Sequence, residues 1–260
     1  MKNDDLGNRM KNYEKVARQY LSPNQFYILR IDGKAFHSYT KGLERPFDEG
    51  LIEDMQETMK YLCEEIQGAQ FGYTQSDEIT IVFTDLMSRQ ADIWFNGAVQ
   101  KIVSVAASLA TAAFNDLRVG RILNNPELYD ESRKLAQFDA RVFPVSQRHE
   151  ALNCVLWRQQ DASKNSIQML ARSLFSHKEL QGLSGSQLQD KMMLEKGVNW
   201  NDIATTKKRG SACYKDIRLV DADLVTGDKF RTYWKIDKEI PIFSKDWSWF
   251  DDKVTKGDCE

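Results

Sequence analysis

The chain has 260 residues, of which 42% are hydrophobic, and a formal net charge of −2. This composition is typical of a folded protein with a packed core. Because the charge is nearly balanced, the field of the whole molecule would not attract a polyanion, which only a local basic patch could hold. No apolar run reaches the roughly 18–20 residues of a membrane span, and residues 1–15 lack the apolar middle of a signal peptide. We therefore expect a cytoplasmic protein without a membrane partner.

The cysteines lie far apart in the sequence, at Cys63, Cys154, Cys213 and Cys259. None has the neighbouring cysteine or histidine that a zinc site requires. We expect free thiols.

Helical and strand-like patterns alternate along the first part of the chain. The spacing of apolar residues and the turn signals predict these elements in order: a helix over 3–20, a strand over 26–31, a helix over 48–66, a hairpin over 71–83, a helix over 88–115 and a strand over 138–144. Strand, helix, hairpin, helix and strand form the βαββαβ order of the ferredoxin-like arrangement. We therefore expect an α+β fold, with an antiparallel sheet and helices on one of its faces.

The remaining third of the chain has a different pattern of predicted elements. A helix is predicted over 155–175, a polar stretch broken by glycines follows over 182–206, and a basic turn at 207–209 leads into a possible strand. We expect residues 1–145 to form the core and residues 146–260 to form an elaboration packed on it, within one continuous domain.

Two acidic turns follow predicted buried strands. Asp32 and Gly33 follow the first strand, and Ser76, Asp77 and Glu78 form the bend of the hairpin. In a split βαβ sheet the first strand and the hairpin are neighbours, so both carboxylates could meet at one end. Carboxylate oxygens suit Mg²⁺, which takes further ligands from water and substrate phosphates. Such a site would stabilise charge in phosphoryl or nucleotidyl transfer.

The same turns also allow a purely structural interpretation, since a single aspartate after a strand is most often a turn former. Gly33 favours function, because it lets a ligand approach the backbone. The turn through Lys34, Ala35, Phe36 and His37 could then offer successive N–H groups to a triphosphate. His37 could transfer a proton or bind phosphate, although a histidine in a loop is more often a surface group.

Several charged residues also allow both a functional and a structural interpretation. Arg45 could meet a phosphate or a base edge together with Asp48, or Asp48 could simply cap the helix that follows. Basic side chains that could contact nucleic-acid phosphates, but that could equally form a solvated surface, are Arg141, Arg158, Lys164, Lys208 and Arg209.

Two strings carry a family resemblance: RIDGKAFHSYT at 30–40 and YTQSDEITIVF at 73–83. In this order and spacing they resemble the hallmark motifs of the tRNA-histidine guanylyltransferase superfamily, the 3′-to-5′ nucleotidyltransferases. The resemblance covers nearly the whole chain, continuing through RPFD at 45–48, WF at 94–95 with Lys101, FDARVFPV at 138–145, LWRQQDASKNSI at 156–167 and KKRGSACYK at 207–215.

The resemblance implies a polymerase palm-like core that binds two Mg²⁺ ions through Asp32, Asp77 and the carbonyl of Gly33. Asp32, Asp77 and Glu78 would be the catalytic carboxylates, with Ser76 supporting the turn. ATP or GTP would activate the 5′-monophosphate of a tRNA, and the 3′-hydroxyl of an incoming NTP would then attack the activated phosphate.

It also implies roles outside the acidic turns. Gly33 to His37 would surround a triphosphate, Arg45 and Asp48 would lie near the activating nucleotide, and Lys101 would meet a triphosphate across a subunit contact. The family commonly forms tetramers, so we expect a homotetramer, a dimer of dimers. The residues that would contact tRNA are Arg141, Arg158, Lys164, Asn165, Lys208 and Arg209.

One stretch departs from the guanylyltransferases proper. They carry His-Ile-Asn-Asn-Leu-Tyr-Asn where this chain reads SKNSI at 163–167, so that only Asn165 remains. The difference favours the guanylyltransferase-like branch, associated with template-directed repair of 5′-truncated tRNAs, over guanosine addition to tRNA-His.

Two alternatives belong to other classes. A palm-fold nucleotidyl cyclase would use the same carboxylates and Mg²⁺, but the basic segments at 158–164 and 207–209 argue against it. An RNA-binding module without catalysis would have no need of Asp32, Gly33 and Asp77.

Overall fold

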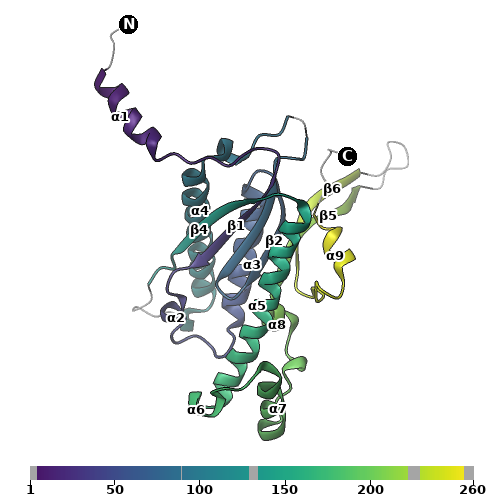
Figure 1. Ribbon diagram of the computed structural model, residues 1–260. Helices are drawn as coiled ribbons and strands as arrows, with labels where there is room; N and C mark the ends of the chain where they lie inside the picture. The colour runs from purple at the N-terminus through teal and green to yellow at the C-terminus, as the bar shows by residue number, and fades with distance from the viewer. Residues whose placement is uncertain (1–4, 89, 129–133, 222–228, 255–260) are drawn as a thin grey trace.

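The computed structural model describes residues 5–88, 90–128, 134–221 and 229–254. It shows an α+β fold built on one six-stranded sheet, with the order β4-β1-β3-β2-β5-β6 and antiparallel neighbours throughout (Figure 1). The strands are β1 (Phe26–Gly33), β2 (Ala69–Gln75), β3 (Glu78–Thr84), β4 (Phe138–Val145), β5 (Ser211–Asp221) and β6 (Lys229–Asp237).

The helices lie on both faces of this sheet and at its ends. The α-helices are α1 (Asp5–Val16), α2 (Phe36–Tyr39), α3 (Glu49–Glu65), α4 (Val99–Asn124), α5 (Arg148–Leu174), α6 (His177–Leu180), α7 (Gly185–Lys196), α8 (Thr205–Arg209) and α9 (Trp247–Asp251). Short 3-10 turns are η1 (Trp94–Gly97), η2 (Pro126–Leu128) and η3 (Trp200–Asp202).

The predicted βαββαβ order is present as β1, α3, β2, β3, α4 and β4, with the strand order expected for that arrangement. Helices α3 and α4 pack on one face, and α5 crosses the other (Figure 1). The prediction of helices on one face is therefore correct only for the first 145 residues, because the C-terminal part supplies the helix that covers the second face.

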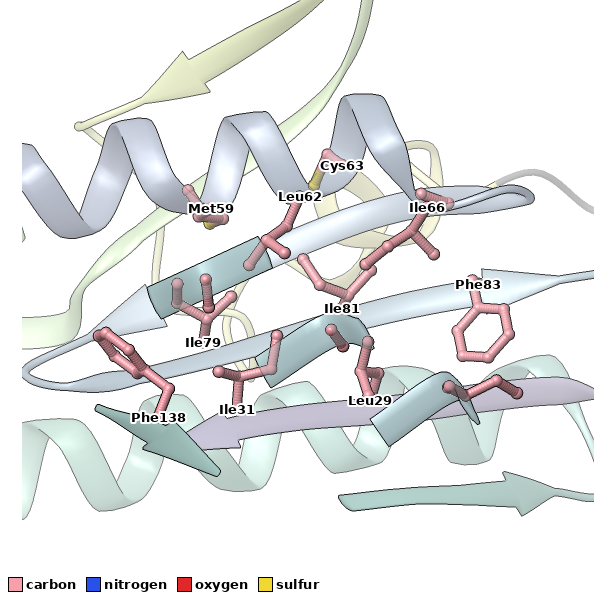
Figure 2. Close-up of a cluster of buried hydrophobic side chains, with 14 of the residues drawn as sticks. Leu29, Ile31, Met59, Leu62, Cys63, Ile66, Ile79, Ile81, Phe83 and Phe138 are labelled. Atoms are coloured by element: carbon pink, nitrogen blue, oxygen red, sulfur yellow. The ribbon is translucent and has the colours of Figure 1, made fainter. Parts of the chain in front are cut away.

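The central strands are buried on both faces, which explains their continuous apolar runs. Leu29 and Ile31 of β1 and Ile81 of β3 point toward α3, where they meet Leu62 (Figure 2). Side chains of alternate parity point the other way; Ile28, Val82 and Phe71 join Val155 of α5 in the second core. This alternation places every second residue of β1 and β3, Asp32 and Glu78 included, on the α5 side.

Helix α4 is displaced along the chain relative to the prediction. It starts at Val99 because η1 interrupts the pattern, with left-handed backbone at Phe95 and Asn96, both at φ 52°. It does not end at Asn115. The Asn115 amide instead donates to the carbonyls of Thr111 and Ala136, which ties the helix to the segment before β4.

Two elements differ from the rest in how they pack. By length and composition α4 could cross a bilayer, but Ile102, Ala106, Ala110 and Phe114 are fully buried against the sheet. Helix α1 has no buried residue and extends away from the body (Figure 1).

The described cysteines, at positions 63, 154 and 213, are free as expected, and Cys259 lies outside the described residues.

The C-terminal part extends the sheet. The possible strand after the basic turn is β5, which pairs with β2 from Phe71↔Tyr214 to Thr74↔Ser211. Its own partner, β6, was not predicted from the sequence. The polar stretch that precedes β5 forms α7, η3 and α8, which gather at the end of α5 (Figure 1).

Candidate active site

The two acidic turns meet at one end of the sheet, as the sequence predicted. Antiparallel pairing of β1 with β3 sets Asp32 opposite Glu78, and the N–H of Gly33 donates to the carbonyl of Asp77 at 3.0 Å. The bend is tight, since Ser76 has a left-handed backbone at φ 54°. Hydrogen-bonded strand ends thus hold the two turns in register.

A cleft of about 300 Å³ opens over this point, between the strand ends and α5. Its sheet side consists of Asp32 and the bend from Gln75 to Glu78, and its helix side of Arg158, Asn165, Gln168, Met169 and Arg172. Asn165, Gln168, Met169 and Arg172 follow Arg158 by 7, 10, 11 and 14 residues, which are close to whole helical turns, so they share one face of α5. The sequence analysis did not name Gln168, Met169 and Arg172 as site residues. Their helical spacing from Arg158 was the signal that could have identified them.

The pKa of Asp32 is raised in the cleft. Burial is the main cause that raises the pKa of Asp32, and Glu78 and Asp139 raise it further, whereas Arg141 and Arg30 lower it. The carboxylates of Asp32 and Glu78 and that of Asp139 thus lie close enough to repel one another, which favours the binding of a cation beside Asp32.

Burial also raises the pKa of Asp77, and the negative charges of Asp32 and Glu78 add to the shift. Hydrogen bonds from Ser76 Oγ, at 3.0 Å, and from its own backbone N–H oppose it. Asp77 thus binds a proton more readily than an ordinary aspartate, and a cation would replace that proton.

The donor set fits Mg²⁺. In the part of the chain that the structure describes, no three His, Cys, Asp or Glu side chains are grouped to hold a metal. A magnesium ion here would therefore be held by the carboxylates of Asp32 and Asp77, the carbonyl of Gly33 and oxygen atoms of the substrate, which is the mixed, hard-oxygen set that it prefers.

Glu78 is engaged by two arginines. Its Oε2 accepts from Arg30 Nη2 at 2.8 Å and its Oε1 from Arg158 Nε at 2.6 Å, with only 13% of its side chain exposed. Arg158 also pairs with Asp161, and its guanidinium lies 4.5 Å from the ring centre of Trp157. Because both oxygens are occupied, Glu78 connects β3 to α5 and is not free to act as a third ligand.

The turn after Gly33 leaves backbone donors open. Among the hydrogen bonds of the described residues, none uses the N–H of Ala35, Phe36 or His37. Ala35 has a left-handed backbone, at φ 54°, and precedes the short helix α2. Phe36 is buried in the core and anchors the turn. This geometry supports the predicted triphosphate contact, which stays a prediction.

Asp48 caps α3, since its Oδ1 accepts from the N–H of Leu51 at 2.7 Å. Lys34 and Asp48 also line a larger cavity of about 1260 Å³, whose other wall includes Arg118 and Arg121 of α4. Arg45 is exposed in the loop before α3. The predicted roles of Arg45 and Asp48 beside a nucleotide stay open.

Lys208 does not lie where its predicted role requires. Only 9% of the residue is exposed, and its Nζ donates to the carbonyl of Asn201 at 2.6 Å. Its own carbonyl accepts from Ser166 Oγ of α5. Lys208 therefore joins α8 to α5, and the prediction that it contacts RNA phosphates is wrong because it is buried.

The other predicted RNA contacts occupy varied positions. Arg141 is half-exposed and faces Asp139 at 3.2 Å and Asp32 at 3.9 Å. Lys164 is exposed on α5, and Arg209 is partly exposed at the end of α8. Their contacts with RNA stay predictions.

Lys101 lies at the opposite end of the sheet from Asp32. It is exposed near the start of α4, where its Nζ is 4.4 Å from the ring centre of Phe95, and the preceding Gly97 pairs with Leu21 before β1 begins. Within one chain it cannot join the cleft, so its predicted triphosphate contact requires a second subunit.

Comparison with known proteins decides the family. The model of the family described as tRNAHis guanylyltransferase matches residues 7–146, more than half of the chain. The chain belongs to the tRNAHis guanylyltransferase family. It is therefore a nucleotidyltransferase, as the sequence motifs indicated.

Two solved structures match nearly the full length of this chain, and a further relative matches about three quarters of it. A bacterial tRNA(His) guanylyltransferase-like protein in complex with ATP shares 42% identity at a TM-score of 0.83, covering 97% of this chain and 100% of its own. One in complex with GTP shares 40% at 0.80, covering 96% and 99%. The tRNA(His) guanylyltransferase of Schizosaccharomyces pombe is 26% identical over 218 residues, covering 78% of this chain and 77% of its own.

Proposed function

We propose that this protein is a Mg²⁺-dependent, template-directed 3′-to-5′ nucleotidyltransferase that activates and extends the 5′ end of truncated tRNA. The observation that carries the proposal is the convergence of Asp32 and Asp77 beneath a polar face of α5, in a palm-like core. The ATP and GTP complexes of the bacterial guanylyltransferase-like proteins support nucleotide binding by this fold.

The departure at 163–167 supports repair over guanosine addition. In α5 Ser166 is fully buried, and its hydroxyl bonds the carbonyl of Lys208 and accepts from the Trp200 indole at 3.1 Å. That position therefore serves packing, and Asn165 is the amide of this stretch that lines the cleft, with Gln168 next to the stretch. A face with so few base-reading groups fits an enzyme in which a template strand selects the nucleotide.

In the proposed mechanism the chain positions two phosphate groups. The N–H groups of Ala35 to His37 bind the triphosphate, while Asp32 and Asp77 provide the oxygen ligands. Bound Mg²⁺ would neutralise charge on the phosphoryl oxygens. The Arg30–Glu78–Arg158 contacts hold α5 over the bend, so that the acceptor 5′ end enters between α5 and the carboxylates.

We also propose that the enzyme acts as a cytoplasmic homotetramer. The far position of Lys101 supports assembly, since only a neighbouring subunit could bring this side chain to a triphosphate.

The proposal is tested by incubating the protein with Mg²⁺, ATP, all NTPs and a labelled tRNA that lacks its first nucleotide. We expect the tRNA to gain one matched nucleotide at its 5′ end. A cyclic nucleotide formed from ATP or GTP without RNA would support the cyclase instead. Tight RNA binding without any Mg²⁺-dependent product would support a binding module.

A further inference from the structure

The α5 side of the cleft carries a cation that the proposed mechanism does not use. Arg172 lies at the far end of the helix face that begins with Arg158. Its Nη2 contacts Gln168 Oε1 at 3.4 Å, and no carboxylate pairs with it among the described residues. Arg158, in contrast, is committed to Glu78 and Asp161.

The charge of Arg172 favours an anion on its side of the cleft. Its guanidinium is exposed at the cleft, while Asp32 and Asp77 form the opposite wall. An anion between them would meet the guanidinium of Arg172 on one side and the proposed metal-binding carboxylates on the other. Arginine suits a phosphate in such a place, because its planar fork can donate two parallel hydrogen bonds.

We propose that Arg172, assisted by the Gln168 amide, binds the 5′-terminal phosphate of the acceptor RNA. The assignment rests on the proposed function. In the proposed mechanism the turn from Ala35 to His37 provides the backbone donors for a triphosphate. Phe36 of this turn packs in the core on the α3 and α4 face of the sheet, whereas α5 covers the opposite face. The phosphate on the α5 side is then the one that is activated and attacked.

The test is a binding measurement with two synthetic stem-loop RNAs that differ only in carrying a 5′-monophosphate or a 5′-hydroxyl, in Mg²⁺ without nucleotides. We expect the wild type to bind the phosphorylated RNA about tenfold more tightly, as one charge-assisted contact would produce. Arg172→Gln should reduce this ratio below about twofold, and Arg172→Lys should keep part of it. Lys178→Gln, which removes an exposed charge from α6, should leave the ratio unchanged.

Binding of ATP to the same variants separates the two sources of phosphate. Arg172→Gln should leave ATP affinity unchanged. Weaker ATP binding with an intact 5′-phosphate preference would assign Arg172 to the nucleotide and overturn the proposal, as would a wild type that does not distinguish the two RNAs. A wild type that distinguishes them but adds no nucleotide would contradict the proposed function alone.

Discussion

At the scale of single residues, the two aspartates of the cleft lower the stability of the metal-free protein. Asp32 and Asp77 are partly buried beside other carboxylates, which raises their pKa values. A carboxyl group with a raised pKa in the folded state stabilises the fold at low pH, and this contribution is lost as the pH rises through the folded pKa. Without metal, the two ionised groups therefore destabilise the protein at neutral pH.

Asp77→Asn should remove that repulsion. We expect the metal-free variant to melt roughly 2 to 4 °C above the wild type at pH 7, which corresponds to about 1 kcal/mol in a chain of this size. The difference should shrink as the pH falls and Asp77 becomes protonated. Thermal melts between pH 4 and 8 in EDTA would measure it.

The same variant should lose the response to Mg²⁺ and roughly 100- to 1,000-fold in nucleotide addition, as removal of one preorganised transition-state stabiliser typically does. Asp190→Asn, at an exposed position of α7, is the matched control and should change neither property. An Asp77→Asn protein that melts lower than the wild type in EDTA would contradict the account of its pKa.

Glu78 should act through its arginine partners. In a double-mutant cycle with Glu78→Ala and Arg158→Ala, we expect each single change to destabilise the fold by about 3 kcal/mol, because it leaves a nearly buried charge with fewer partners. The double variant should be more stable than the sum predicts, with a coupling energy of about 1–3 kcal/mol. Urea unfolding measures all four proteins, and additive effects would show that the contact contributes nothing.

At the scale of elements, local patterns predicted the core well. The strand at 26–31, the hairpin at 71–83 and the cap at Asp48 all depend on neighbours in sequence, and the structure confirms them. The errors arise where distant groups decide the outcome. Asn115 would end an isolated helix, but here its amide is satisfied by Ala136. Lys208 belongs to a basic run, but its Nζ is satisfied by the carbonyl of Asn201.

A buried glutamine of α5 bonds the backbone of the C-terminal segment, beside the apolar contacts of the second core. Gln159 is 3% exposed, donates to the carbonyl of Pro241 at 2.8 Å and accepts from the N–H of Phe243 at 2.9 Å. Gln159→Leu would leave both backbone groups buried without partners.

We expect Gln159→Leu to lower the free energy of unfolding by about 3 kcal/mol, since each unsatisfied group costs about 1–3 kcal/mol. Gln100→Leu, at an exposed position of α4, is the control and should change stability by less than about 0.5 kcal/mol. Hydrogen exchange at the Phe243 amide should accelerate only in the first variant. Equal unfolding midpoints for the two variants would show that this contact does not hold the segment.

At the scale of the whole molecule, two parts of the chain build one sheet. The first 145 residues form four strands in the predicted order, and the remainder adds β5 and β6 at one edge and α5 across the open face. The β5–β6 pairing could not be predicted, because a polar strand has no apolar pattern in the sequence and is identified only by the strand with which it pairs. The cleft exists only because both parts meet at the strand ends.

This arrangement also explains how a chain of net charge −2 could act on RNA. Several cations beside the cleft are already committed to protein contacts, since Arg158 and Arg30 bind Glu78, and Lys208 is buried. What remains near the cleft is a small set that includes Arg141, on β4, and Arg172, on α5. Local contacts of this kind suit recognition of an RNA end rather than of an extended duplex.

Template dependence tests the central claim most directly. Four truncated tRNAs that differ only in the nucleotide opposite the missing 5′ position should be incubated with Mg²⁺, ATP and all four NTPs, and the added nucleotide identified by sequencing. The account predicts that the added nucleotide changes with the template and forms a Watson–Crick pair in each case. Addition of guanosine whatever the opposing nucleotide would contradict it.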